Sequence, residues 1–342
     1  MSTQNVKLRD VANPSGSTAA ITTTYAGEFA GDYIAAALLS GNTLANGGIT
    51  IKPNVKYQEV IKKLDLTDAL VAATCDFTAA ADKITLTERI LTPTELQVNL
   101  ELCKKDYRSD WEAIQMGISA FDNLPPSFAD FLIGQVAAKV AESIEHTIWN
   151  GEVGGATGYA LFDGILHKLA DATADIPNAQ EVTGTTVTSS NVITELGKVA
   201  DAIPSALYGK EDLHIYIPQN VHRAYVRSLG GYAVQAYGTS GSESAAASVG
   251  ANGYEGRGTT WYNNQALTFD GIKLFVANGL PSNKMVAAER SNLFFGTGLQ
   301  SDMNEVKVID MADIDGSQNV RMVMRATAGV EVGVVEDVVI YS

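Results

Sequence analysis

A long amphipathic helix is the feature of this sequence that most restricts its fold. Two prolines end whatever precedes it, Ser127 with Asp130 forms a capping-box-like start, and Gly151 suits the position after its last turn. The 23 residues of 127–149 would form a rod of roughly 35 Å. Its apolar residues fall at four-residue intervals: Phe128, Leu132, Val136, Val140, Ile144 and Ile148. Because a helix repeats every 3.6 residues, this stripe winds around the rod, and we expect different packing neighbours along its length.

Residues 83–102 predict one side of a β-hairpin with an apolar face. In the second part of the segment, apolar and polar residues alternate as in a half-buried strand, with Leu96, Val98, Leu100 and Leu102 on one side and Glu95, Gln97, Asn99 and Glu101 on the other. Pro93 restricts the middle of the segment to an edge, a strand start or a bulge. Together with the preceding TCDFTAAAD, this indicates a long hairpin with its tip near 80–83. Residues 55–73 mix helical and strand-like spacing and stay unassigned. Such a hairpin is marginally stable alone, so we expect it to need a partner surface.

The first 50 residues are apolar, yet they are broken up by Gly, Ser and Thr. Between residues 11 and 50 the only charges are Glu28 and Asp32, which is unlike a disordered tail of low hydrophobicity and high net charge. Asp32 can cap a short helix over 33–39. Three aromatic residues recur at four-residue spacing as one stripe: Tyr25, Phe29 and Tyr33. The segment is too fragmented to form a core, so we expect it to bury its apolar residues against another surface.

The second half of the chain predicts alternating helices and strands. Residues 192–203 form an amphipathic helix with five residues on one face: Val192, Ile193, Leu196, Val199 and Ile203. LHIYIP is a strand ended by Pro218, and a helix over 219–229 begins after this proline. Its inward residues are expected to be Val221, Tyr225 and Val226. Asp270–Gly271 is a turn between strands, and the C-terminal NVRMVMRATAGVEVGVVEDVVIY is β-branched strand.

The sequence carries no motif of a catalytic or metal-binding site. None of its four histidines, His146, His167, His214 and His222, forms HExxH or a zinc-type spacing with cysteine. A P-loop and a G-x-S-x-G elbow are also absent. We therefore expect no catalytic residue, cofactor or metal, although an enzyme site assembled from distant residues remains an alternative. Cys75 and Cys103 are too few for a disulfide framework and are expected to be free thiols.

The formal net charge of −15 over 342 residues argues against a protein that grips nucleic acid, because neutralising phosphates needs clustered Lys and Arg. Residues 113–185 carry −7 and residues 301–342 carry −5. Residues 51–112 are near neutral but dense in both signs, as suits either a solvated face or a surface that meets a complementary partner. No apolar run approaches the roughly 20 residues of a membrane span. The first residues lack the apolar core of a secretion signal, so we expect the chain to fold in a cytoplasm.

The order of these elements resembles that of the major capsid proteins of tailed bacteriophages, which share the Hong Kong 97 type of fold. The resemblance covers essentially the whole chain. Three stretches carry it by their joint order: LTPTELQVNLELCKKDYRSDW leading to the long helix, LHIYIPQNVHRAYVRSL, and FDGIKLFVANGLP before the C-terminal strands. The resemblance implies an α+β fold with an N-terminal arm, an extended β-hairpin loop, a long spine helix, and peripheral and axial domains.

The resemblance also implies a division of the chain into parts. Residues 1–50 would be the N-terminal arm, 51–112 the extended loop, 113–187 the peripheral domain with spine helix 127–149, 188–300 the axial domain, and 301–342 the strands that return to the peripheral domain. The two acidic blocks would then lie in one domain and give it a charge of −12.

The function implied is that of a structural, non-enzymatic protein. Copies would assemble into hexamers and pentamers of an icosahedral shell that encloses double-stranded DNA without binding it specifically. The further partners implied are portal, scaffolding and decoration proteins, with no membrane, and the location is a virion capsid made in the bacterial host cytoplasm. Some relatives begin with a scaffolding segment that is cut off. This chain shows none, so a separate scaffolding protein or a prior cleavage is implied.

On this reading the apolar arm and the hairpin lie on neighbouring subunits. The residues expected at contacts between subunits are Tyr25, Phe29, Tyr33, Lys83, Glu88, Arg89, Glu95 and Glu101. Some relatives crosslink a loop lysine to an asparagine of a neighbour. Lys83 lies near the expected hairpin tip, but no local motif supports that role, and an ordinary surface charge is the alternative.

Three other functions stay open at this level. The same fold also forms cellular nanocompartments of the encapsulin type that hold an enzyme cargo; the loose Gly/Ser/Thr arm favours the phage, because those relatives tend to begin with an ordered helix. An α+β enzyme would need a pocket with converging carboxylates of perturbed pKa. A surface or adhesion protein is disfavoured by the missing secretion signal.

Overall fold

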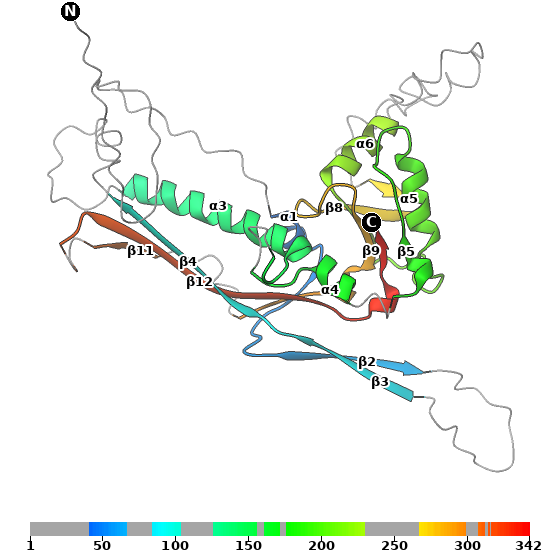
Figure 1. The fold of residues 1–342 in the computed structure, drawn as a ribbon, viewed down its shortest axis with the longest axis horizontal. Coiled ribbons are helices and arrows are strands. Elements are labelled where there is room, and N and C mark those ends of the chain that lie inside the picture. The colour runs from blue at the N-terminus through cyan, green and yellow to red at the C-terminus, as the bar shows by residue number, and fades with distance from the viewer. Residues whose placement is uncertain are drawn as a thin grey trace, which may run out of the picture. The chain divides into compact units, whose positions relative to one another are not determined.

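The computed structural model describes residues 41–66, 84–103, 126–155, 161–171, 176–229, 267–298, 307–311, 314 and 316–342. Helices and strands are mixed within these ranges (Figure 1). The chain divides into two compact units: residues 1–37, 97–137 and 301–325 form the first, and residues 38–96, 138–300 and 326–342 form the second. Several sequence predictions lie outside the described residues, namely the short helix 33–39, the aromatic stripe of Tyr25, Phe29 and Tyr33, Cys75, and Lys83 with the hairpin tip.

A six-stranded sheet forms the core of the second unit. Its strand order is β5 (Glu181–Val182), β13 (Val339–Tyr341), β9 (Met285–Glu289), β6 (Leu213–Ile217), β8 (Ile272–Val276) and β7 (Thr268–Phe269). The pairs β5·β13 and β6·β8 are parallel, and the others are antiparallel. Asp270 and Gly271 both have positive φ, 50° and 80°, as a type I′ hairpin turn requires. The turn predicted between β7 and β8 is therefore confirmed.

Two helices pack against this sheet: α5 (Val192–Asp201) and α6 (Gln219–Leu229). Both were predicted, and strand β6 ends just before Pro218, as expected. The inward face predicted for α5 is wrong at Ile193, whose side chain is 51% exposed. Glu195, which was not predicted to face inward, is almost completely buried. On α6, Val221 and Tyr225 are buried, whereas Val226 is only half-buried.

A second sheet contains β1 (Thr50–Lys52), β10 (Leu293–Thr297), β12 (Asn319–Val332) and β11 (Lys307–Asp310), with β4 (Thr94–Cys103) also paired to β12. The long C-terminal strand β12 confirms the β-branched pattern. Its residues 328–332 pair with β10 and its residues 320–323 pair with β11. β4 confirms the strand predicted in the second part of 83–102, but the predicted half-buried apolar side is wrong at Leu100, which is 44% exposed.

The long helix α3 (Pro126–Asn150) confirms the prediction of 127–149. Within the second unit its C-terminal part is buried by α1 (Asn42–Ala45) and by the loop at Gly279, and Ile148 and Trp149 are fully buried. The short helix α4 (Ile165–Asp171) follows. Three 3-10 turns complete the described elements: Asn178–Gln180, Arg290–Asn292 and Val335–Asp337.

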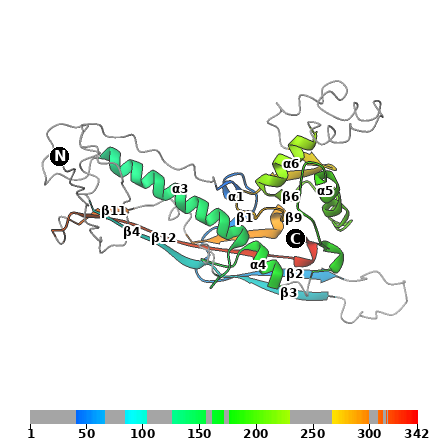
Figure 2. The same cartoon turned by 45° about the horizontal axis from the view of Figure 1, so that its top comes forward.

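A separate two-stranded ribbon is formed by β2 (Glu59–Leu66) and β3 (Ile84–Leu91), which Figures 1 and 2 both show as one antiparallel pair. The strand that pairs with β3 is therefore 59–66. TCDFTAAAD, which precedes the predicted strand, lies outside the described residues. Residues 55–73, which the sequence left unassigned, contain the pairing strand.

Candidate interaction surface

The register of the β2–β3 ribbon sorts its side chains onto two faces. Residues opposite each other in an antiparallel pair lie on the same face, and successive residues alternate. Val60 faces Ile90, and Leu64 faces Leu86. These pairs share one face with Ile84 and with the opposed charges of Lys62 and Glu88. We call this the outer face of the ribbon: Val60, Lys62, Leu64, Ile84, Leu86, Glu88 and Ile90.

The outer face is apolar and open to solvent. Its five large apolar side chains are all exposed: Val60 and Ile90 at 44%, Leu64 at 66%, Ile84 at 65% and Leu86 at 63%. Single exposed apolar residues are ordinary, but five on one face, in pairs on both sides of the Lys62–Glu88 pair, are typical of an interaction site. A ribbon of only two strands is also marginally stable alone. The outer face is therefore the strongest candidate for a functional surface among the described residues.

The opposite, inner face is tied to its own chain by ion pairs. The Arg89 Nε lies 3.0 Å from a carboxylate oxygen of Glu331, and the Lys52 Nζ lies 2.9 Å from that of Glu59. Lys63 forms a third ion pair, with Glu336. Leu91 at the end of β3 is fully buried. These contacts hold the base of the ribbon, so the outer face is presented to solvent.

The structure places the predicted contact residues in different settings. Glu88 lies exposed on the outer face, and Glu95 lies exposed on β4. Arg89 lies on the inner face and pairs with Glu331. In the first unit, Glu101 pairs with Arg321 at 3.2 Å and accepts a hydrogen bond from the Asn319 amide. The ribbon thus brings Glu88 and Arg89 together as neighbours on opposite faces, and the role of all four between subunits stays a prediction.

The apolar stripe predicted on the long helix is buried toward the C-terminal end of α3. Ile144 and Ile148 are buried in the second unit. In the part of the helix that precedes them, Val136 is buried and Val140 is half-buried. Phe128 and Leu132 lie in the first turns of α3, where the backbone alone is described. The packing role of these residues in a larger assembly stays a prediction.

Three ribbon residues were missed by sequence reasoning: Val60, Leu64 and Ile90. In β3 a signal was present, because ITLTERI alternates with period two. In β2 the signal is weak, since Ile61 follows Val60 and two lysines follow Ile61. Only the pairing of β2 with β3 shows which side chains share a face.

A buried carboxylate fixes the segment at the start of the described chain. Glu145 on α3 accepts the Thr43 backbone N–H at 3.0 Å and the Thr43 hydroxyl, and the Trp149 indole N–H donates to that hydroxyl oxygen at 2.9 Å. The Gly279 N–H lies 3.4 Å from the same carboxylate. Burial raises the pKa of Glu145 and outweighs the hydrogen bonds from Thr43 and Gly279 and the nearby His146. We call the set Thr43, Glu145, Trp149 and Gly279 the Glu145 clasp.

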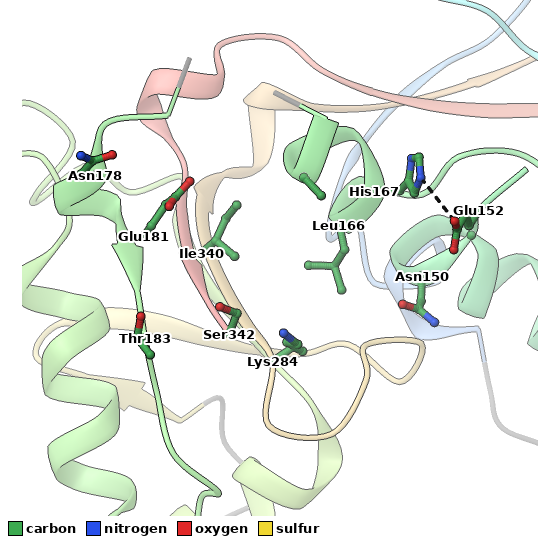
Figure 3. A pocket seen from close by; sticks show the side chains of 12 residues that line it. Asn150, Glu152, Leu166, His167, Asn178, Glu181, Thr183, Lys284, Ile340 and Ser342 are labelled. Carbon is green, nitrogen blue, oxygen red and sulfur yellow. Dashed lines mark ion pairs between the residues drawn. The ribbon is translucent and has the colours of Figure 1, made fainter. Parts of the chain in front are cut away.

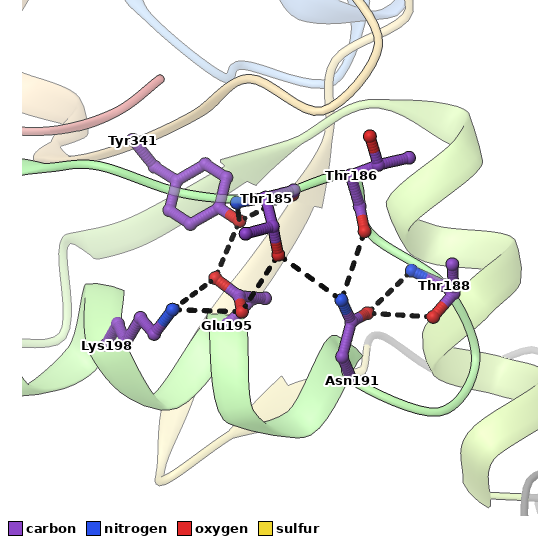
Figure 4. A network of polar contacts seen from close by, with 7 residues as sticks. All are labelled: Thr185, Thr186, Thr188, Asn191, Glu195, Lys198 and Tyr341. Atoms are coloured by element: carbon purple, nitrogen blue, oxygen red, sulfur yellow. Dashed lines mark hydrogen bonds and ion pairs between the residues drawn. The ribbon is translucent and has the colours of Figure 1, made fainter.

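A second polar network ties the C-terminus to α5 (Figure 4). The Tyr341 hydroxyl lies 2.7 Å from the Glu195 carboxylate, and Lys198 donates to the same carboxylate at 2.9 Å. Burial and the Glu195 carboxylate raise the pKa of Tyr341 to about 12. Burial also opposes ionisation of Glu195, but the hydrogen bonds from Lys198 and Tyr341 outweigh it and lower the pKa of Glu195. The network is saturated with internal partners, which is typical of a structural role.

A pocket of about 490 Å³ lies beside α4 (Figure 3). Glu152 and Glu181 line it together with His167 and Lys284, over the apolar side chains of Leu166 and Ile340. The His167 ring lies 3.4 Å from the Asp171 carboxylate and 3.9 Å from that of Glu152. The lining mixes both signs of charge and shows no converging set of acid, base and nucleophile.

The described ranges were compared with the requirements of a metal site and of a membrane-spanning helix. In those ranges no three His, Cys, Asp or Glu side chains are grouped so that they could hold a metal ion. Cys103 is a free thiol there. In the same part of the chain, no helix combines the length and the apolar character that a membrane crossing requires.

Comparison with known proteins gives matches among solved structures only. No family model and no curated protein matches the sequence. The capsid of a native GTA particle matches at 12% identity, covering 91% of this chain and 93% of that chain, with a TM-score of 0.55. A chain of Mycobacterium phage Adephagia matches at 12% identity, covering 90% and 91%, with a TM-score of 0.54. The capsid of the Cyanophage P-SCSP1u matches at 14% identity, covering 93% and 91%, with a TM-score of 0.50.

These matches define the class of fold, because each spans nearly the whole of both chains. The chain has the mixed helix-and-strand fold of phage capsid subunits. The resemblance to the capsid proteins of tailed phages that the order of sequence elements indicated is confirmed at the level of the fold.

Proposed function

We propose that this chain is the major capsid protein of a tailed phage, assembling into hexamers and pentamers of an icosahedral shell that encloses double-stranded DNA. The observation that carries the proposal is the exposed outer face of the ribbon on a chain with the fold of phage capsid subunits. A face with five exposed apolar side chains needs a cover. In a closed symmetric shell a neighbouring copy supplies that cover, and every copy both lends and receives such a surface.

The finer parts of the fold follow from the same proposal. The ribbon would be the core of the extended loop of 51–112, and α3 would be the spine helix. Residues 188–300, which include α5, β6 and α6, would form the axial domain, and residues 113–187 and 301–342 the peripheral domain. Residues 1–50 would be the arm that lies on neighbouring copies. The Glu145 clasp supports this assignment, because it anchors the chain at Thr43, near the end of the arm.

The role proposed is structural. The contacts of the Glu195 network and the mixed lining of the pocket favour stability over catalysis. The solved structures reported above come from phage and GTA particles, so we rank the phage shell ahead of an encapsulin-type nanocompartment. Portal, scaffolding and decoration proteins would be the further partners, and the packaged DNA would be confined without specific binding. The site of action would be the virion, after synthesis in the host cytoplasm.

Concentration-dependent light scattering of the purified chain tests this proposal. A shell protein assembles above a threshold concentration into particles far larger than one subunit. We expect such a threshold for the natural chain, and we expect it to rise sharply when an outer-face leucine is replaced by a charged residue. Scattering of a single subunit at every concentration would contradict the proposal.

A further inference from the structure

A buried carboxylate lies under the base of the ribbon. Glu331 on β12 has a side chain that is only 4% exposed. It accepts a hydrogen bond from the Arg89 Nε at 3.0 Å and lies 3.3 Å from the Lys168 Nζ. Arg89 belongs to β3 of the ribbon, and Lys168 belongs to α4. One carboxylate therefore joins three separate segments of the second unit.

The environment of Glu331 makes this junction directional. A buried charge is costly unless it is paired in good geometry, and removing one partner leaves an uncompensated charge. Hydrogen bonds between arginine and a carboxylate are also strong and planar, so they fix orientation as well as distance. The ribbon cannot turn away from β12 without exposing or unpairing Glu331.

Two glycines next to Glu331 allow the end of β3 to pack closely against β10 and β12. Gly296 on β10 and Gly329 on β12 are direct register partners. A Cβ atom on Gly296 would lie 2.8 Å from the Leu91 side chain, and one on Gly329 would lie 2.8 Å from the Thr92 carbonyl oxygen. The paired glycines form a notch that receives the chain where β3 ends. The ribbon base is therefore held by close backbone contact, with the Glu331 junction beside it.

The second strand of the ribbon is attached on the same side. Lys63 of β2 pairs with Glu336 in the 3-10 turn that follows β12. Both strands are thus tied through the inner face, and none of these ties uses the apolar side chains of the outer face. The direction in which the outer face points is set by contacts within the chain.

We infer that Glu331 is a positioning residue for assembly: through Arg89 and Lys168 it fixes the direction of the ribbon and so the angle at which a second copy meets the outer face. This inference rests on the proposed function. A closed shell requires each copy to present its interface at a nearly constant angle, since a wrong rotation gives open sheets or tubes. Loss of the junction should therefore alter the shape of the assembly more than the tendency to assemble.

Glu331→Gln in the full chain tests the inference, with particle shape scored by negative-stain microscopy. The change removes the negative charge and keeps the side-chain shape. We expect particles to form at a concentration near that of the natural chain. We expect closed shells of the natural diameter to fall by about tenfold or more, the factor that corresponds to one lost charged hydrogen bond, and open or irregular particles to replace them.

Glu289→Gln is the matched control. Glu289 lies on β9, is mostly buried, and pairs with Lys210 at 2.8 Å, outside the junction of Glu331 with Arg89 and Lys168. The control makes the same charge change and should leave shell diameter unaltered. Unaltered shells from Glu331→Gln would overturn the inference, as would equal damage from Glu289→Gln.

A second variant keeps the test decisive where Glu331→Gln fails to fold. Arg89→Gln removes the ribbon side of the junction and leaves Glu331 paired with Lys168. We expect it to fold and to give the same mixture of irregular particles, and shells of natural diameter from this variant would overturn the inference. Failure of the natural chain itself to form any shell would instead contradict the proposed function, so the two failures are distinguishable.

Discussion

Leu64 of β2 and Leu86 of β3 stand directly opposite each other on the ribbon, 66% and 63% exposed. No other described part of the chain covers this pair enough to bury the two side chains. Cross-strand apolar pairs stabilise a sheet locally, but exposure of this extent leaves most of the hydrophobic free energy unused. The pair is thus a sensitive place to separate association from folding.

Leu86→Lys should abolish assembly and leave folding intact. The free energy of unfolding of the unassembled subunit should change by no more than about 0.5 kcal/mol, because the position is exposed. Light scattering and urea unfolding measure the two effects. Thr85→Lys, the adjacent residue on the inner face, is the control and should assemble normally. A variant that loses stability and assembly in parallel would show that the outer face serves the subunit's own fold.

Two truncations separate the proposed arm from the clasp that anchors it. Deletion of 1–40 removes most of the arm but leaves Thr43 on Glu145, so we expect a folded subunit that fails to close shells. Deletion of 1–45 also removes Thr43 and leaves a buried carboxylate short of donors, which should cost about 1–3 kcal/mol more. Urea unfolding of both proteins gives the difference. Equal stability of the two truncations would contradict the importance of the clasp, and normal shells from either would contradict the role of the arm.

The raised pKa of Glu145 predicts a dependence of stability on pH. Because the pKa of Glu145 is higher in the folded than in the unfolded chain, the folded state holds its proton over a range where the unfolded state has lost it. Stability from this group is complete below the ordinary value of 4.5 and is lost as pH rises through the raised value. The slope should reach at most about 1.4 kcal/mol per pH unit.

Glu145→Gln checks this sign, because its amide cannot ionise and its one oxygen can replace Oε1, which accepts the Thr43 hydroxyl and the Gly279 N–H. The free energy of unfolding of the natural chain minus that of the variant should decrease as pH rises above 4.5. The change also leaves the Thr43 backbone N–H, which donates to Oε2, without its acceptor; this should add a cost of about 1–3 kcal/mol that does not vary with pH. A difference that grows with rising pH would refute the assignment of a raised pKa.

The glycine notch predicts opposite effects for two glycine-to-alanine changes. Gly329→Ala would bring a Cβ to 2.8 Å from the Thr92 carbonyl oxygen and 3.0 Å from the Pro93 Cα, and such overpacking typically costs about 1–3 kcal/mol. Gly197→Ala on α5 meets nothing within 4 Å and should stabilise by about 0.5–1 kcal/mol through helix propensity. Thermal unfolding of both variants distinguishes them, and similar melting temperatures would argue against a tight notch.

The parts of the fold that were predicted are those with strong local signals. Helix α3 has proline before it and a regular apolar stripe, and the turn at Asp270–Gly271 has the residues that its backbone requires. The predicted inward face of α5 was wrong at Ile193, because a periodicity argument assigns only apolar residues to the buried side of a helix. In the structure, Glu195 is buried instead, since Tyr341 and Lys198 satisfy its carboxylate.

The candidate surface was predicted only in outline. The sequence predicted a hairpin with an apolar face that needs a partner surface, and the structure contains a ribbon with such a face. Its pairing strand was missed because β2 lacks clean alternation. The contact of Arg89 with Glu331, which lies 242 residues further along the chain, was not predicted. Contacts over such separations leave no local pattern in a sequence.

Electron microscopy of the purified full chain tests the central claim most directly. The claim is that the outer face of the ribbon is covered by another copy within a closed shell. We predict closed icosahedral particles in which β2 and β3 of each subunit contact a neighbouring subunit through Leu64 and Leu86. Particles in which these two leucines face solvent, or a chain that remains a single subunit at every concentration, would contradict the account.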